Sequence, residues 1–95
     1  MSTPSKEDAQ QFFDLSNRFV TLANELGEEH GKPRVSAAIL WAASRYSAFT
    51  WVMSGAPQKQ TPEEAVELFV AQYRKMLVDN LKYMREQFED SPGPK

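Results

Sequence analysis

Apolar residues recur along the first third of the chain at the spacing of one helix face. They alternate at intervals of three and four residues: Phe12, Leu15, Phe19, Leu22 and Leu26. This spacing places side chains in one stripe along an α-helix, and polar residues fill the opposite side. Glycines and a proline within residues 27–33 are typical of a helix end followed by a loop. The pattern predicts a helix over about residues 5–29.

The last third of the chain has a second amphipathic stripe and a clear start signal. Thr61 precedes Pro62, and Glu64 follows three residues after Thr61, which predicts a capped helix start. The stripe consists of Val66, Val70, Tyr73, Leu77, Leu81, Met84 and Phe88. We predict a helix over about residues 62–89. The first helix has two candidate starts, Thr3 with Pro4 or Ser5 with Asp8.

The central segment, about residues 34–54, is also helical in pattern but carries almost no charge. Between Val35 and Ser54 the only charged residue is Arg45. A helix that is apolar on most of its circumference is expected to be buried on most of it. Two neighbouring helices cover only part of a middle helix, so an aromatic sector is expected to stay exposed. This sector contains Trp41 with Val52, or Leu40 with Trp51.

These elements predict an all-α fold, a three-helix up-down-up bundle in a single domain over residues 1–95. The tails, residues 1–4 and 90–95, are expected to be flexible because they are rich in Pro, Gly and Ser. Because large exposed apolar patches usually mark interfaces, the uncovered sector of the central helix predicts self-association, most simply a homodimer.

Composition narrows the classes of function. The chain has 11 basic and 13 acidic residues, interspersed, and a net charge of −2, which argues against a nucleic-acid partner. There is no cysteine, so disulfides and thiol chemistry are excluded. The N-terminus lacks the pattern of a signal peptide, so a cytoplasmic location is expected. Residues 35–53 are long enough to cross a bilayer, but Arg45 and several hydroxyl residues argue against a membrane span.

Arg45 is the main candidate for a functional side chain. An unpaired buried charge is very costly, so its guanidinium must reach water or a partner. A structural interpretation pairs it with Asp14, Glu67 or another acidic residue, or lets it extend to solvent. A functional interpretation makes it an anion-binding residue, with aromatic neighbours as the walls of a pocket. The candidate interaction or ligand residues are Trp41, Arg45, Tyr46, Phe49 and Trp51.

No other residue supports catalysis, a metal or a cofactor. His30 is the only histidine, and a stable transition-metal site needs three or four converging ligands. The serines and threonine of the central helix have no base to activate them as nucleophiles. The acidic cluster at Glu63, Glu64 and Glu67 is explained by the dipole at a helix N-terminus. We therefore expect no enzymatic activity and no cofactor.

The run from Val35 to Phe49, VSAAILWAASRYSAF, preceded by residues 12–19, FFDLSNRF, resembles a known family. This is a small proteobacterial domain-of-unknown-function family of short helical proteins. The resemblance covers about residues 12–81 and includes Asn17, Arg18 and the Arg45–Tyr46 pair. It implies a bacterial, cytosolic protein and supplies no catalytic residue, cofactor or substrate.

The leading functional hypothesis is a non-enzymatic interaction or self-assembly protein, whose partner is a second copy or another protein. The alternative is a binder of a small acidic ligand, in a pocket around Arg45 and the neighbouring aromatic residues. The first hypothesis predicts a flat apolar surface and assembly that depends on concentration. The second predicts a concave pocket and thermal stabilisation by one class of small acids.

Overall fold

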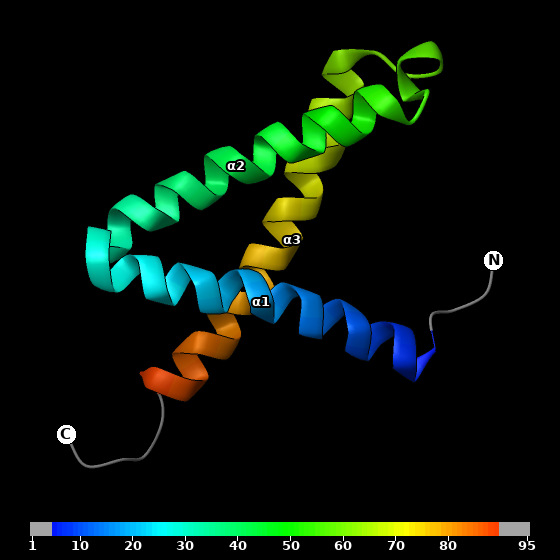
Figure 1. The fold of residues 1–95 in the computed structure, drawn as a ribbon. Coiled ribbons are helices and arrows are strands. Elements are labelled where there is room, and N and C mark those ends of the chain that lie inside the picture. The colour runs from blue at the N-terminus through cyan, green and yellow to red at the C-terminus, as the bar shows by residue number, and fades with distance from the viewer. Residues whose placement is uncertain (1–4, 90–95) are drawn as a thin grey trace. The chain divides into compact units, whose positions relative to one another are not determined.

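A computed structural model describes residues 5–89 of the chain, and these residues form three α-helices and no strand. The helices are α1 (Lys6–His30), α2 (Lys32–Met53) and α3 (Pro62–Phe88), and a short 3-10 helix, η1 (Ala56–Gln58), lies between the last two (Figure 1). The predicted all-α class is confirmed, and the helix bounds agree with those expected to within two residues. The two tails, for which flexibility was predicted, lie outside the described residues.

The start of α1 is set by Ser5, which decides between the two candidate starts. The Ser5 hydroxyl accepts a hydrogen bond from the Asp8 backbone N–H at 3.1 Å, and the Ser5 N–H donates to the Asp8 carboxylate at 3.4 Å. This reciprocal arrangement satisfies two N–H groups that otherwise lack partners at a helix start. Thr3 and Pro4 lie outside the described residues.

The turn between α1 and α2 is shorter than expected. A loop was predicted around residues 27–33, but α1 continues to His30 and α2 begins at Lys32, so Gly31 alone connects them. Gly31 has φ 93° and ψ 137°, and its N–H donates to the Gly27 carbonyl at 3.0 Å. Pro33 lies in the first turn of α2, where its missing N–H has no intrahelical partner to lose.

The connection from α2 to α3 also follows from its sequence. Gly55 has a left-handed φ of 84° and ends the helical stretch before η1. The Trp51 indole N–H donates to the Gln60 side-chain oxygen at 2.6 Å, which joins the last turn of α2 to the loop. At α3, Thr61 and Glu64 form a second capping box, as predicted, with bonds of 2.8 and 3.1 Å.

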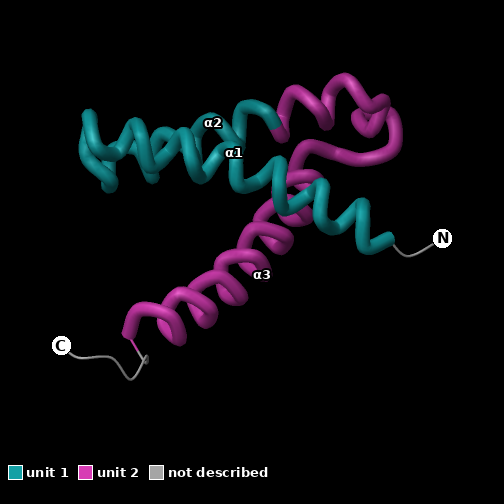
Figure 2. The backbone as a smooth tube through the Cα atoms, turned by 60° about the horizontal axis from the view of Figure 1, so that its bottom comes forward, with its two compact units in different colours: residues 1–46 teal, residues 47–95 magenta. Residues whose placement is uncertain are grey.

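The chain divides into two compact units, residues 1–46 and 47–95 (Figure 2). In the first unit the chain reverses at Gly31, so α1 and the first part of α2 run back in a helical hairpin. The second unit contains the end of α2, η1 and the whole of α3, which is one unbroken helix. That residues 1–95 form a single domain stays a prediction.

The described residues bury very little apolar surface. Among the apolar side chains of residues 5–89, only Val35 of α2 and Ala65 of α3 are buried. The sequence predicted that α2 would be buried on most of its circumference, and this expectation is wrong. Its bulky side chains Ile39, Phe49 and Met53 are 47–69% exposed. None of the helices within residues 5–89 combines the length and the apolar character that a membrane span requires.

Candidate interaction surface

The apolar stripe of α3 is an exposed surface in its own right. Its seven members range from 42% exposed at Leu77 to 82% at Phe88. Because α3 is regular from Pro62 to Phe88, the side chains of the stripe lie one above another along about six turns. The surface is therefore long, narrow and apolar.

The α1 stripe is exposed in the same way. Its members are 38–65% exposed, with Leu26 the least and Phe19 the most accessible. The rings of Phe12 and Phe13 lie edge to face, with centroids 5.5 Å apart, near the N-terminal end of this stripe. Soluble monomeric proteins rarely expose contiguous apolar surface on this scale, so the stripe is a second candidate for contact with a partner.

Three of the predicted site residues lie on the part of α2 in the first unit. The Arg45 guanidinium carbon lies 4.6 Å from the centroid of the Trp41 ring, a cation–π distance. Within residues 5–46 no carboxylate forms an ion pair with Arg45, and Asp14 instead accepts a hydrogen bond from the Gln10 side chain at 2.9 Å. Trp41 is 60% and Tyr46 68% exposed. The expected aromatic neighbour of the guanidinium is present on its own helix.

The other two predicted residues, Phe49 and Trp51, lie in the second unit and differ in exposure. Phe49 is 56% exposed. Trp51 is half-buried, and its indole N–H is occupied by the bond to Gln60. Trp51 therefore closes the end of α2, a role that the sequence pattern did not reveal because the partner is in the loop.

Three hydroxyl groups in α2 or directly after it donate to the backbone of the preceding turn. Ser44 donates to the Trp41 carbonyl at 2.7 Å, Thr50 to that of Ser47 at 3.0 Å, and Ser54 to that of Trp51 at 2.8 Å. Such bonds to the preceding turn are an ordinary use of Ser and Thr in helices. They explain these hydroxyl groups without a chemical role.

The titratable residues do not gather into a site. Within residues 5–89 no three His, Cys, Asp or Glu side chains are placed to hold a metal ion. The His30 ring nitrogen lies 3.7 Å from the Glu29 carboxylate, and both side chains are about half exposed or more. The backbone N–H and then the hydroxyl of Thr61 lower the pKa of Glu64 below its ordinary value, because both hydrogen bonds favour the carboxylate.

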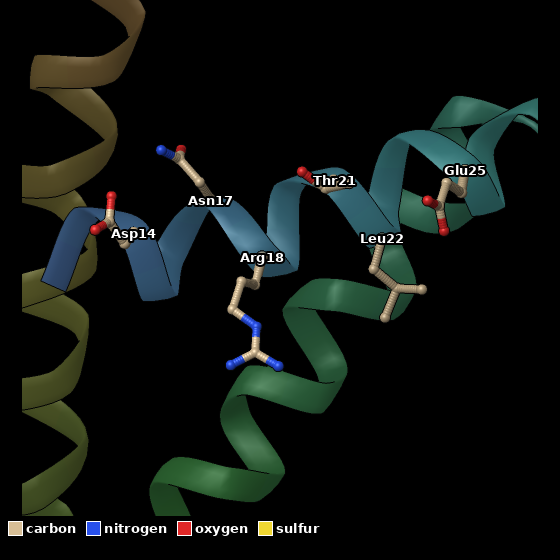
Figure 3. Close-up of a pocket in the computed structure, with 6 residues that line it drawn as sticks. All are labelled: Asp14, Asn17, Arg18, Thr21, Leu22 and Glu25. Carbon is tan, nitrogen blue, oxygen red and sulfur yellow. The ribbon is translucent and has the colours of Figure 1, made fainter. Parts of the chain in front are cut away.

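A shallow hollow of about 390 Å³ lies along residues 14–25 of α1. Its lining comes from this helix alone: Asp14, Asn17, Arg18, Thr21, Leu22 and Glu25 (Figure 3). In the close-up Asn17 and Thr21 point to one side of the helix, while Arg18 and Leu22 point to the other. The side chains do not converge on one point, so the hollow does not resemble a pre-formed ligand pocket.

Sequence reasoning missed how much apolar surface the outer helices expose. It assigned the uncovered surface to α2 alone, because it assumed that α1 and α3 bury their stripes against α2. Of the two alternatives for that sector, Trp41 and Val52 are 60% and 59% exposed. In the other alternative Leu40 is 53% exposed, but Trp51 is half-buried. The α1 and α3 stripes are exposed to a similar degree. The exposed fractions in the structure, and not the sequence pattern, identify them as part of the candidate surface.

Comparison with known proteins yields one family. Residues 12–84 match a family described as "Protein of unknown function (DUF3144)". Neither a curated protein nor a solved structure matches the chain. The matched range contains the stripes of α1 and α3 almost completely, and all five candidate residues of α2.

Proposed function

This chain belongs to the DUF3144 family of proteins of unknown function, and we propose that it is a non-enzymatic self-assembly protein whose partner is a second copy. The observation that carries the proposal is the exposure of an apolar stripe on each of two amphipathic helices, α1 and α3. Residues 12–81 resemble a small proteobacterial family of short helical proteins, and on this ground we propose a bacterial protein that works in the cytoplasm.

The free energy available for association is substantial. Burying one exposed Phe or Leu side chain completely stabilises by roughly 1.5–3 kcal/mol, so a half-exposed one still offers about 1 kcal/mol. Phe12, Phe19 and Leu22 of α1 are each more than half exposed. A handful of such side chains on each copy offsets the several kcal/mol of freedom that two chains lose when they associate.

The chemistry of the chain favours assembly over catalysis. It has no cysteine and one histidine, and His30 has a single carboxylate near it among the described residues. General acid–base chemistry needs a positioned pair of groups near a substrate site. The proposal of self-assembly rests on the exposed apolar stripes of α1 and α3.

Sedimentation equilibrium over about 5–500 µM protein tests the proposal, a range that brackets micromolar affinities. We expect the mass to rise from that of one chain, 10.8 kDa, to twice this value. The thermal midpoint should rise with protein concentration, because association stabilises the folded chain by mass action. A mass of one chain at every concentration would overturn the proposal.

A second candidate function is the binding of a small acid at Arg45. The supporting observation is that the guanidinium stacks on Trp41 and has no carboxylate partner within residues 5–46, so its N–H donors are available. Small dicarboxylates should then raise the thermal midpoint of the wild type but not of the Arg45→Gln variant. Equal midpoints with and without every acid tested would exclude this function.

A further inference from the structure

The α3 stripe repeats every eleven residues. Val66, Val70 and Tyr73 are followed eleven positions later by Leu77, Leu81 and Met84, and Phe88 begins a third repeat. An eleven-residue repeat fits 3.67 residues per turn, close to the 3.6 of a straight helix. The stripe therefore stays on one side of α3 along its whole length, and a partner helix can follow it with little supercoiling.

The spacing between successive stripe residues is the same from either end of α3. Successive members are separated by 4, 3, 4, 4, 3 and 4 residues, so the pattern is symmetric about Leu77. A second α3 that runs in the opposite direction about Leu77 therefore meets a stripe residue at every level. Val70 lies opposite Met84, Tyr73 opposite Leu81, and Leu77 opposite its own copy.

The two flanks of the stripe differ in chemistry. At 100° per residue, Phe69, Met76 and Tyr83 lie along one flank. Phe69 is half-buried, and the other two are more than half exposed. The opposite flank carries Glu63, Glu67 and Arg74 before Leu77, and Val78 and Arg85 after it. Arg85 also donates to the Glu89 carboxylate of its own helix at 2.7 Å.

The flanks distinguish the two ways of pairing α3 with a second copy. In a parallel pair each flank faces the other flank of the partner, so Glu67 and Arg85 would lie against Phe69, Met76 and Tyr83. In an antiparallel pair like flanks face each other, so apolar side chains meet apolar ones. Glu67 then lies at nearly the same level as Arg85 of the copy, and these opposite charges favour this register.

We propose that α3 is the interface of the self-associated protein, and that it pairs antiparallel with α3 of a second copy across a two-fold axis at Leu77. This inference rests on the proposed self-association and adds its location and direction. The contact spans the 22 residue steps from Val66 to Phe88, about 33 Å. Glu67 of each copy lies near Arg85 of the other, and Phe69 lies near Tyr83.

Single-cysteine variants test the direction and register, because the natural chain has no cysteine. The variants are Leu77→Cys, Val70→Cys and Met84→Cys, with Lys75→Cys on the far side of α3 as the matched control. Each variant is checked for helicity, oxidised mildly at micromolar concentration, and analysed by non-reducing gel and mass spectrometry.

The proposal predicts that the Leu77→Cys variant cross-links with itself, roughly a hundredfold faster than the Lys75→Cys control, because assembly raises the local thiol concentration. The Val70→Cys and Met84→Cys variants should not cross-link alone, since their own copies lie about 21 Å apart, beyond the reach of a disulfide. A mixture of these two variants should give the mixed cross-linked dimer.

The other outcomes separate failure of this inference from failure of the proposed function. If the Val70→Cys and Met84→Cys variants each cross-link with themselves, the pairing is parallel and the inference is wrong. If no pair of stripe positions cross-links although the wild type sediments as a dimer, α3 is not the interface, and self-association stands. If the wild type sediments as a monomer, both proposals fail.

Discussion

Ser5 and Thr61 determine where two of the three helices begin, and each does so with its side chain and its backbone together. Thr61 donates its N–H to Glu64 at 2.8 Å and accepts from the Glu64 N–H at 3.1 Å. All of these groups are exposed, so the bonds act on the local helix start and do not depend on a buried core. Such local devices matter more in a chain whose described residues bury so few side chains.

Replacing the capping threonine should destabilise the chain measurably. The Thr61→Ala variant loses the acceptor of the Glu64 N–H, and we expect the free energy of unfolding to fall by about 1 kcal/mol. Urea denaturation followed by circular dichroism, at one fixed protein concentration, measures the change. The Thr61→Ser variant keeps the hydroxyl and should stay close to the wild type, and a loss as large as that of alanine would contradict the role of the hydroxyl.

The same cap predicts a dependence on pH. The backbone N–H and then the hydroxyl of Thr61 hold the pKa of Glu64 below its ordinary value in the folded chain. The folded state thus favours the carboxylate, and this contribution is present above pH 4.5 and lost as the pH falls through the lowered value. NMR titration should show the lowered pKa of Glu64 in the wild type. In the Thr61→Ala variant the pKa should rise only part of the way toward its ordinary value, because alanine keeps the backbone N–H that is the larger cause. An unchanged pKa would contradict the contribution of the hydroxyl.

At the scale of elements, the sequence predicted the helices well because their signals are local. The stripe spacing, the capping Thr61 and the glycines each depend only on residues within one or two helical turns of one another. The turn between α1 and α2 is shorter than the sequence predicts, because Gly27 and Pro33 are both residue types typical of loops. Gly27 instead lies buried inside α1, and Pro33 lies in the first turn of α2, where a proline costs nothing.

Replacing each of two glycines at this turn by alanine should change the stability in opposite directions, although the glycines are only four residues apart. Gly31 has φ 93°, a conformation that side chains rarely adopt, so we expect the Gly31→Ala variant to lose about 1–3 kcal/mol of stability. Gly27 is helical, and a methyl group there would lie 3.4 Å from the Lys32 side chain, an ordinary contact. The Gly27→Ala variant should therefore be neutral or more stable by up to about 1 kcal/mol. Urea denaturation compares the two, and equal losses would contradict this account of the turn.

At the scale of the whole molecule, the sequence was informative about which surface is apolar but not about which apolar surface is exposed. Arg45 stands out in the sequence because it is an isolated charge in an apolar helix, and the structure places its guanidinium over the Trp41 ring. The exposed stripes of α1 and α3 were not foreseen, because periodicity places side chains on a face without saying what covers it. The partner of Trp51 was missed because Gln60 belongs to no periodic pattern.

Charge reversal tests the antiparallel assembly through groups that lie outside its apolar centre. The Glu67→Arg variant places like charges near Arg85 of the partner at both ends of the interface, and the Arg85→Glu variant does the same near Glu67. At roughly 0.5–1 kcal/mol for each of two exposed contacts, each single change should weaken dimerisation about tenfold. Sedimentation equilibrium at low ionic strength measures the dissociation constant.

The double variant, Glu67→Arg with Arg85→Glu, separates pairing across the interface from a general effect of charge. It restores opposite charges across the antiparallel pair, so its dissociation constant should return to within about threefold of the wild type. The Glu86→Arg control, on the side of α3 away from the stripe, should change little. Salt near 1 M should reduce the differences among all variants, because exposed charges are screened within about 3 Å. In a parallel pair these charges face apolar side chains, so a double variant no tighter than the singles would contradict the antiparallel direction.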